Sequence, residues 1–185
     1  MLIKVGLIHA QFETIHPFLD GNGRVGRLLI TFLLCEEGIL KQPLLYLSYY
    51  FKRHRSEYYD RLQAIRDKGD WEGWLKFFLR GVYEVAQEAT DTARKIVNLR
   101  EAHRQLIAER LGRGAARAHS LLEKLYYRPF VSVDLVSEIT GLTYPNANVL
   151  VRQFCDIGLL TEITGQKRYR RFSYGPYMTL FKEEP

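Results

Sequence analysis

The sequence predicts a mainly α-helical protein, in which a helical bundle is followed by a small winged helix-turn-helix domain. Apolar residues recur at spacings of three and four through most of the first 111 positions, which is the period of a helix. Glycines at positions 112 and 114 interrupt this pattern. Short helical and alternating segments then follow in the order of a winged helix. We therefore predict two domains, residues 1–111, which end in a connecting helix, and residues 112–185.

The composition of the chain is that of a folded globular protein. Of its 185 residues, 46% are hydrophobic and 26% are charged, which excludes a disordered tail, a collagen-like rod and a disulfide scaffold. Its longest apolar stretches are much shorter than the ~20 residues that cross a bilayer, and its N-terminus lacks the pattern of a signal peptide. We therefore expect a cytoplasmic protein without membrane contact, with Cys35 and Cys155 as buried free thiols.

In the first domain, apolar periodicity and helix breakers predict a succession of helices. Pro17 ends the first helix because proline cannot continue a helix interior. Gly38 is expected to cap the C-terminus of the second helix, and Asp70 the N-terminus of a long later one. The predicted helices cover residues 1–15, 25–35, 56–68, 71–89 and 90–111, and Pro43 opens a short segment at 44–51.

The second domain is predicted from shorter elements. Ser132 is expected to cap a helix that ends at Gly141, and Gly165-Gln166 to form the turn of a hairpin. The predicted helices cover residues 115–125, 133–139 and 144–157, with β-prone segments at 130–133, 159–163 and 169–174.

A dozen residues between the first two predicted helices combine the groups that bind phosphate. The segment reads His16-Pro17-Phe18-Leu19-Asp20-Gly21-Asn22-Gly23-Arg24-Val25-Gly26-Arg27. A helix that begins after glycines offers free N–H groups at the positive end of its dipole. Arg24 and Arg27 share one face of that helix, Asp20 supplies an oxygen ligand that suits Mg²⁺, and His16 can accept a proton. A plain turn with solvated arginines is the alternative, but the density of these groups favours a phosphate site.

The same segment resembles the Fic family signature, His-x-Phe-x-(Asp/Glu)-Gly-Asn-Gly-Arg-x-x-Arg, at every defined position. The resemblance covers roughly residues 1–90. The arrangement of the chain is similar to that of bacterial Fic proteins with a C-terminal winged helix. It implies a Fic-type helical bundle that transfers AMP from ATP to a Ser, Thr or Tyr hydroxyl of a target protein or of itself, with Mg²⁺ as cofactor. A related branch of the family has a lysine at the position of Gly23 and phosphorylates instead, so the glycine favours AMP transfer.

The resemblance also implies a role for each matching residue. His16 is the general base, Asp20 holds Mg²⁺ between the α- and β-phosphates, and Phe18 anchors the loop in the core. Tyr58 and Tyr59 fit a position beside the adenine, with Arg66 nearby, although a half-buried core pair fits them equally well. The residues implied in binding the nucleotide and its phosphates are Gly21, Asn22, Gly23, Arg24, Gly26, Arg27, Tyr58 and Tyr59.

Two elements that usually precede the motif in the family have no room in this chain. They are a β-hairpin flap that aligns the target and, in many members, an inhibitory helix; only fifteen residues precede His16. We therefore expect that the N-terminal part of the family's domain is absent, and that AMP transfer is unregulated but inefficient.

A rival function follows from the basic second half of the chain, where residues 91–185 carry a net charge of +5 against +1 for residues 1–90. In a winged helix, the helix at 144–157 would enter the major groove and the hairpin would touch phosphates. The expected nucleic-acid contacts are Arg152, Lys167, Arg168, Arg170 and Arg171. The alternative to an enzyme is thus a DNA-binding or protein-docking regulator with an inactive Fic remnant, and homodimer formation stays open.

Two further groups of residues are judged outside the motif. His9 and Glu13 lie four residues apart on the first helix, which favours a surface pair over a metal site with His16. A set of aromatic residues keeps helical spacing and is expected in the core: Trp71, Trp74, Phe77 and Phe78.

Overall fold

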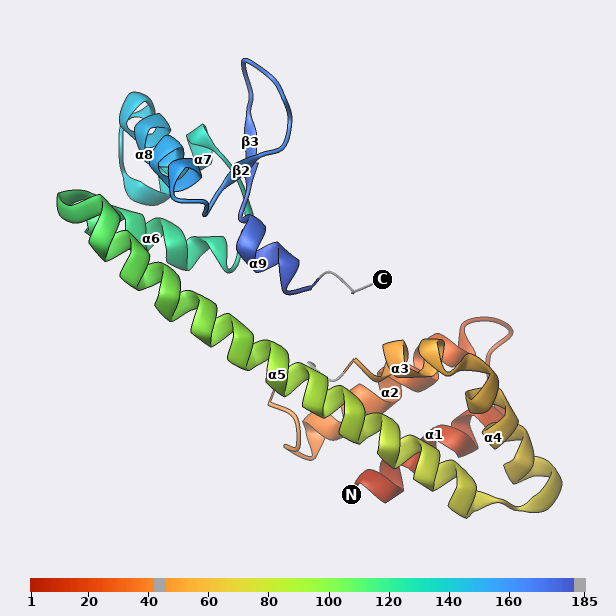
Figure 1. The fold of residues 1–185 in the computed structure, drawn as a ribbon. Coiled ribbons are helices and arrows are strands. Elements are labelled where there is room, and N and C mark those ends of the chain that lie inside the picture. Colours follow the sequence, from red (N-terminus) through yellow and green to blue (C-terminus); the bar gives the residue numbers. More distant parts are fainter. Residues whose placement is uncertain (42–45, 182–185) are drawn as a thin grey trace. The chain divides into compact units, whose positions relative to one another are not determined.

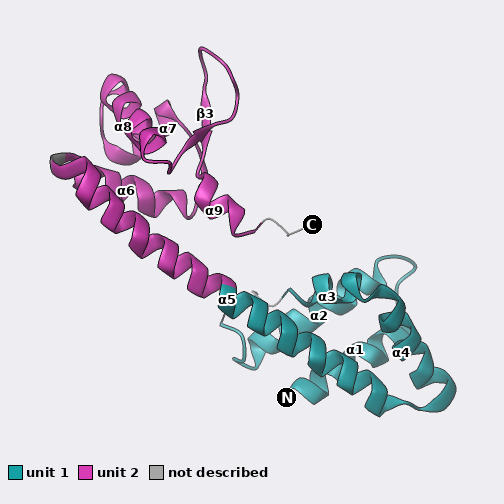
Figure 2. Cartoon of the chain, in the orientation of Figure 1, with its two compact units in different colours: residues 1–91 teal, residues 92–185 magenta. Residues whose placement is uncertain are grey.

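A computed structural model describes residues 1–41 and 46–181, which form two compact units, residues 1–91 and residues 92–185 (Figure 2). The described residues are mainly α-helical, with one small sheet, as predicted (Figure 1). The two units meet inside one continuous helix, α5 (Trp71–Leu111), between Asp91 and Thr92. The predicted division into domains at residue 111 stays a prediction.

Unit 1 contains α1 (Leu2–Ile15), α2 (Asn22–Glu36), α3 (Leu47–Arg53), α4 (Arg55–Lys68) and the first part of α5. The predicted breakers act where expected. Gly38 follows the end of α2 with a positive φ of 69°, and Asp70 caps α5 by accepting the N–H of Gly73 at 2.9 Å. The start of the predicted segment 44–51 lies outside the described residues.

Aromatic rings form much of the core of unit 1. Trp74, Phe77 and Phe78 of α5 are almost completely buried, as predicted, whereas Trp71 is 36% exposed. The Trp74 indole N–H donates to the carbonyl of Gly6 at 2.9 Å, which ties α5 to α1. The ring of Phe78 lies against Gly6, where a Cβ would come within 2.9 Å of it. The glycine therefore allows α1 to approach α5 closely.

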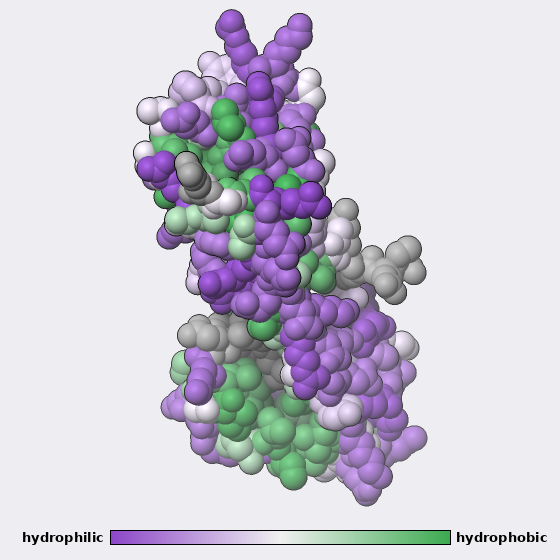
Figure 3. Space-filling view, turned by 60° about the vertical axis from the view of Figure 1, so that its left-hand side comes forward, coloured by the Kyte–Doolittle hydropathy of each residue, from purple (hydrophilic) through white to green (hydrophobic). Residues whose placement is uncertain are grey.

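Unit 1 also exposes apolar side chains on one face, visible as a green area in Figure 3. Leu28 and Phe32 of α2 are 67% and 61% exposed. Two shallow apolar grooves of about 570 and 440 Å³ share Leu29 in their lining.

No helix in the described ranges is long and apolar enough to cross a membrane. Cys35 and Cys155 are free thiols, as predicted, but both are half-buried rather than fully buried.

Unit 2 follows the order predicted for a winged helix-turn-helix. A 3₁₀ turn (Gly112–Gly114) leads to α6 (Ala115–Leu125), β1 (Phe130–Ser132), α7 (Val133–Thr140), α8 (Tyr144–Asp156), β2 (Thr161–Glu162), β3 (Arg171–Ser173) and α9 (Gly175–Thr179). The antiparallel sheet has the order β1-β3-β2, with Val131 opposite Phe172. Ser132 caps α7 by accepting the N–H of Leu135 at 3.3 Å, as predicted. The short helix α9 is not predicted from the sequence.

The C-terminal part of α5 packs within unit 2. Ile107 is fully buried in its core, and Leu99 and Leu106 pack against that core. Arg100 donates to both carboxylate oxygens of Glu123 on α6 at 2.9 Å. This half of α5 therefore stabilises the helix and sheet elements that follow it.

Candidate active site

The loop between α1 and α2 begins with a strained turn at His16. This residue adopts the left-handed conformation (φ 49°, ψ 57°), and its N–H donates to the carbonyl of Phe12 at 3.0 Å. Histidine enters this conformation more readily than most residues, but at a cost of about 1–3 kcal/mol. The turn directs the chain out of α1, and it leaves His16 exposed at the entrance of the loop.

The loop is closed from inside by Asn22, the first residue of α2, which is only 1% exposed. Its side-chain oxygen accepts the N–H of Phe18 at 2.9 Å, and its amide donates to the carbonyl of the same residue. The expectation that Phe18 anchors the loop in the core is wrong, because its ring is 49% exposed. The anchor is Asn22, and its side chain is therefore not free for an anion.

The first turn of α2 leaves backbone donors free beside the loop. Gly21 precedes the helix with φ 85°, and its carbonyl accepts the N–H groups of Arg24 and Val25, both at 3.0 Å. The N–H groups of Asn22 and Gly23 have no acceptor within the helix. Because they lie at the positive end of the helix dipole, this turn favours an anion.

Both arginines of the motif lie against loop glycines. A Cβ on Gly21 would lie 3.6 Å from Nη2 of Arg24, and a Cβ on Gly23 would lie 3.0 Å from Nη1 of Arg27. Asp20 is 94% exposed at its side chain; its Oδ1 accepts the N–H of Gly21 at 2.7 Å, and its Oδ2 lies 3.4 Å from Nη2 of Arg24. The structure thus brings a carboxylate and two guanidinium groups to the free N–H groups of α2.

Gly26 lies away from the loop. It is buried where α1 and α2 cross, and a Cβ there would come within 2.5 Å of Glu13 Oε1 and 3.2 Å of His9 Cε1. Its carbonyl accepts a hydrogen bond from the His9 ring rather than from a ligand. This placement does not fit the predicted role of Gly26 in anion binding, since its lack of a side chain serves the contact between the helices.

His9 is the centre of a buried layer beneath the loop, and the prediction of a surface pair with Glu13 is wrong. His9 is 0% exposed and Glu13 is 7% exposed. Nδ1 of His9 lies 3.0 Å from the carbonyl of Gly26, and Nε2 lies 3.0 Å from the hydroxyl of Tyr58. The carbonyl can only accept, so Nδ1 carries the proton and Tyr58 donates to Nε2.

The environment of His9 keeps its ring neutral. Burial lowers the pKa of His9 from 6.5 to about 4; the hydrogen bond to Gly26 opposes this, and the positive charge of Arg27 adds to it. The rings of Phe51 and Trp74 stack on it at centroid distances of 5.7 and 5.8 Å. His9 is therefore a buried structural residue rather than the surface residue predicted from the sequence.

The two tyrosines of α4 separate in the structure. Tyr58 is 3% exposed and Tyr59 is 55% exposed. Burial raises the pKa of Tyr58, whose hydroxyl is used by His9. For Tyr58 the core alternative holds, and a contact with adenine does not fit. Arg66 donates to the carbonyl of Glu13 at 2.8 Å, which fastens α4 to the end of α1.

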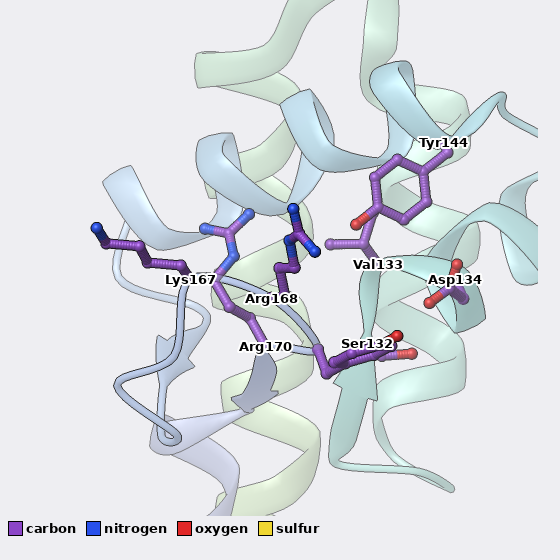
Figure 4. Close-up of a pocket in the computed structure, with 8 residues that line it drawn as sticks. Ser132, Val133, Asp134, Tyr144, Lys167, Arg168 and Arg170 are labelled. Carbon is purple, nitrogen blue, oxygen red and sulfur yellow. The ribbon is translucent and has the colours of Figure 1, made fainter.

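In unit 2, three of the five residues predicted to contact nucleic acid line one pocket of about 320 Å³ (Figure 4). They are Lys167, Arg168 and Arg170, from the segment 163–170 between β2 and β3, which we call the wing. Figure 4 shows the guanidinium groups of Arg168 and Arg170 side by side, with the hydroxyl of Tyr144 directed towards Arg168. Arg152 lies exposed on α8 and Arg171 begins β3, and neither lines this pocket.

The wing is held by its own polar contacts. Arg170 donates to the side chain of Asn148 on α8 at 2.7 Å and lies over the ring of Phe172 at 5.4 Å. Glu162 accepts hydrogen bonds from Thr164 and Gly165, which lower the pKa of its carboxyl group. Asn148 is thereby occupied, so it is not free to read a base.

These features define a mainly helical protein with a loop that brings a carboxylate and two guanidinium groups to the start of a helix. Residues 1–34, which include the whole loop, match the profile of the Fic/DOC family. This segment of the chain is therefore similar to that family.

Comparison with curated proteins gives relatives of the same kind. The chain is 59% identical over 67 residues to a probable protein adenylyltransferase of Aquifex aeolicus. It is 39% identical over 71 residues to a protein adenylyltransferase Fic of Aedes aegypti, and 38% identical over 85 residues to one of Drosophila grimshawi. These matches cover 36%, 38% and 46% of this chain, and 18%, 13% and 15% of the relatives. The matched part is thus less than a fifth of each relative's length.

Proposed function

We propose that unit 1 carries the phosphate-binding part of an ATP site that transfers AMP to a hydroxyl group of a protein. The observation that carries this proposal is the convergence of Asp20, Arg24 and Arg27 on the free N–H groups at the start of α2. The names of the relatives, protein adenylyltransferases, support AMP transfer as the reaction.

The groups of the loop are suited to a triphosphate. The N–H groups of Asn22 and Gly23 donate to phosphate oxygens, and Arg24 and Arg27 neutralise their charge. Within the described residues no group of three or more His, Cys, Asp or Glu side chains is arranged to hold a metal ion. The single carboxylate of Asp20 is enough to fit Mg²⁺, because this ion commonly binds through one carboxylate and the phosphates of the substrate. When bound there, Mg²⁺ neutralises charge on the phosphates and on the leaving group.

His16 acts in this proposal as the general base. Its imidazole accepts the proton of the target hydroxyl while the hydroxyl oxygen forms a bond to the α-phosphorus. The bond between the α-phosphorus and the oxygen bridging to the β-phosphate breaks, and pyrophosphate leaves with both electrons of that bond. A general base of this kind contributes a factor of about 10²–10⁴ to the rate of the reaction. The backbone N–H groups and the arginines of the loop stabilise the charge on the phosphates.

The experiment is incubation with ATP labelled in the α-phosphate, with the purified chain alone and with a cell lysate. We expect label in protein, and its loss in His16→Ala. The matched control is His119→Ala, which removes an imidazole from α6 in unit 2. Full labelling by His16→Ala, with intact folding, would refute the assignment of the base.

A second function, DNA binding by unit 2, is favoured by the basic pocket at the wing. Lys167, Arg168 and Arg170 would contact the phosphates of a duplex, while Arg152 faces it from α8. We expect retardation of duplex DNA that weakens steeply with salt. Arg168→Ala should reduce the salt slope by about one, whereas Lys76→Ala in unit 1 should not. A chain that retards no duplex at low salt would instead favour protein docking by unit 2.

A further inference from the structure

The carboxylate of Glu13 is buried without full hydrogen bonding. Glu13 is 7% exposed, and its Oε1 has no hydrogen-bond partner among the described residues. A buried polar atom without a partner costs free energy, so most proteins avoid one. A glutamine or an apolar residue would fill this space at lower cost. The presence of a carboxylate therefore calls for a reason other than packing.

The charges around Glu13 are those of the phosphate loop. Burial raises its pKa, and three positively charged or titratable groups oppose that shift, namely Arg27, His16 and Arg66. Because Gly26 has no side chain, Oε1 of Glu13 can enter the crossing of α1 and α2. Gly26 directly precedes Arg27 in the sequence. Glu13 itself lies one helical turn before His16. The carboxylate thus lies at the crossing of the two helices that flank the loop.

The hydrogen bonds given to Glu13 do not neutralise its charge. Arg66 donates to the backbone carbonyl of Glu13 and not to its carboxylate. Arg27 places its guanidinium against Gly23 in the first turn of α2. Helical side chains point back towards the N-terminus of their helix, so Arg27 extends towards the loop. An attractive charge behind it would keep it there when no phosphate is bound.

We propose that Glu13 is a positioning residue, whose buried carboxylate holds the guanidinium of Arg27 at the start of α2 for the phosphates of ATP. The inference rests on the proposed function of the loop. It assigns no contact between Glu13 and substrate, because the side chain is enclosed by α1 and α2.

The inference separates affinity from stability. Glu13→Gln keeps the size of the side chain and removes the charge, so we expect unit 1 to be at least as stable as in the wild type. The same change should weaken binding of Mg-ATP about tenfold, which corresponds to about 1.4 kcal/mol. A purely structural role would move stability and affinity in the same direction.

The test is calorimetry of Mg-ATP binding with the full chain, together with urea unfolding. Glu36→Gln, which removes an exposed carboxylate from the other end of α2, is the matched control and should bind as the wild type does. In an Arg27→Ala background, Glu13→Gln should have no further effect on affinity. The reason is that Glu13 acts through the guanidinium of Arg27, which this background lacks. Glu13→Asp, which keeps the charge, should bind more tightly than Glu13→Gln even if it packs less well.

Each outcome decides between the ideas. Equal affinities of the wild type and Glu13→Gln would overturn the positioning role and leave the proposed function standing. The same loss in the Arg27→Ala background, or tighter binding by Glu13→Gln than by Glu13→Asp, would also overturn it. A wild-type chain that binds no Mg-ATP would overturn the proposed function and the positioning role together.

Discussion

Replacing Gly26 by alanine tests whether the loop depends on the close crossing of α1 and α2. A Cβ at this position would lie 2.5 Å from Glu13 Oε1, 3.1 Å from Phe12 Cδ1 and 3.2 Å from His9 Cε1. Overfilling of a packed contact costs about 1–3 kcal/mol, and alanine recovers about 1 kcal/mol as a better helix former. Separation of the helices also weakens the bond from His9 to Gly26, worth about 0.5–1.5 kcal/mol. We expect a net loss of about 0.5–3.5 kcal/mol.

The assay is urea unfolding followed by tryptophan fluorescence. Both tryptophans of the chain, Trp71 and Trp74, belong to unit 1, so the signal reports this unit alone. The control is Gly23→Ala, whose Cβ meets only the end of the flexible Arg27 side chain, at 3.0 Å. It should stay within about 0.5 kcal/mol of the wild type while it weakens ATP binding. A Gly26→Ala protein as stable as the wild type would refute the reasoning.

Three other changes test the buried layer and the loop. The pKa of His9 is about 4 in the folded protein against 6.5 ordinarily, so between these values only the unfolded chain binds the proton. About 3 kcal/mol of stability should therefore be lost as the pH falls from 6.5 to 4, and His9→Gln should remove that slope. Tyr58→Phe leaves Nε2 of His9 without its donor and should cost about 1–3 kcal/mol in urea unfolding; an unchanged midpoint would contradict the assigned bond. Asp20→Asn should raise the Mg²⁺ concentration needed for AMP transfer with little change in stability, and an unaltered Mg²⁺ titration would count against Asp20 as the ligand.

The parts of the fold that were predicted correctly depend on local signals. Pro17, Asp70 and Ser132 end or begin helices through their own backbone or side chain, so they act wherever the segment lies. The start of α2 was placed three residues late, at Val25, because glycine and asparagine are typical of turns. In the structure Asn22 is the first residue of the helix, and its side chain is hydrogen-bonded to Phe18. The helix propensity of asparagine does not take such a contact into account. The helix α9 has five residues, too few to show a period.

The candidate site likewise has one part that local sequence predicts and another that it does not. The loop could be found from the sequence because its groups are consecutive, whereas the layer beneath it joins residues 17 and 49 positions apart. Residue type alone does not predict which side chains of α1 are buried. Ile15 is 64% exposed, whereas His9 and Glu13 are buried. The usable signal was the small residues Gly6, Ala10 and Gly26, which allow helices to approach until polar side chains are enclosed.

That enclosed layer explains how a short, strained loop can keep charged groups in place. Catalysis by placed charge requires donors that do not have to reorganise when the substrate binds. Here Asn22 is bonded to Phe18 within the loop, and His9 is bonded to Gly26 where α1 and α2 cross. A protonated His9 would lose Tyr58 as a donor and would add positive charge beside Arg27. In the proposed site the neutral imidazole therefore has two effects: it holds α2 against α1, and it adds no positive charge beside Arg27.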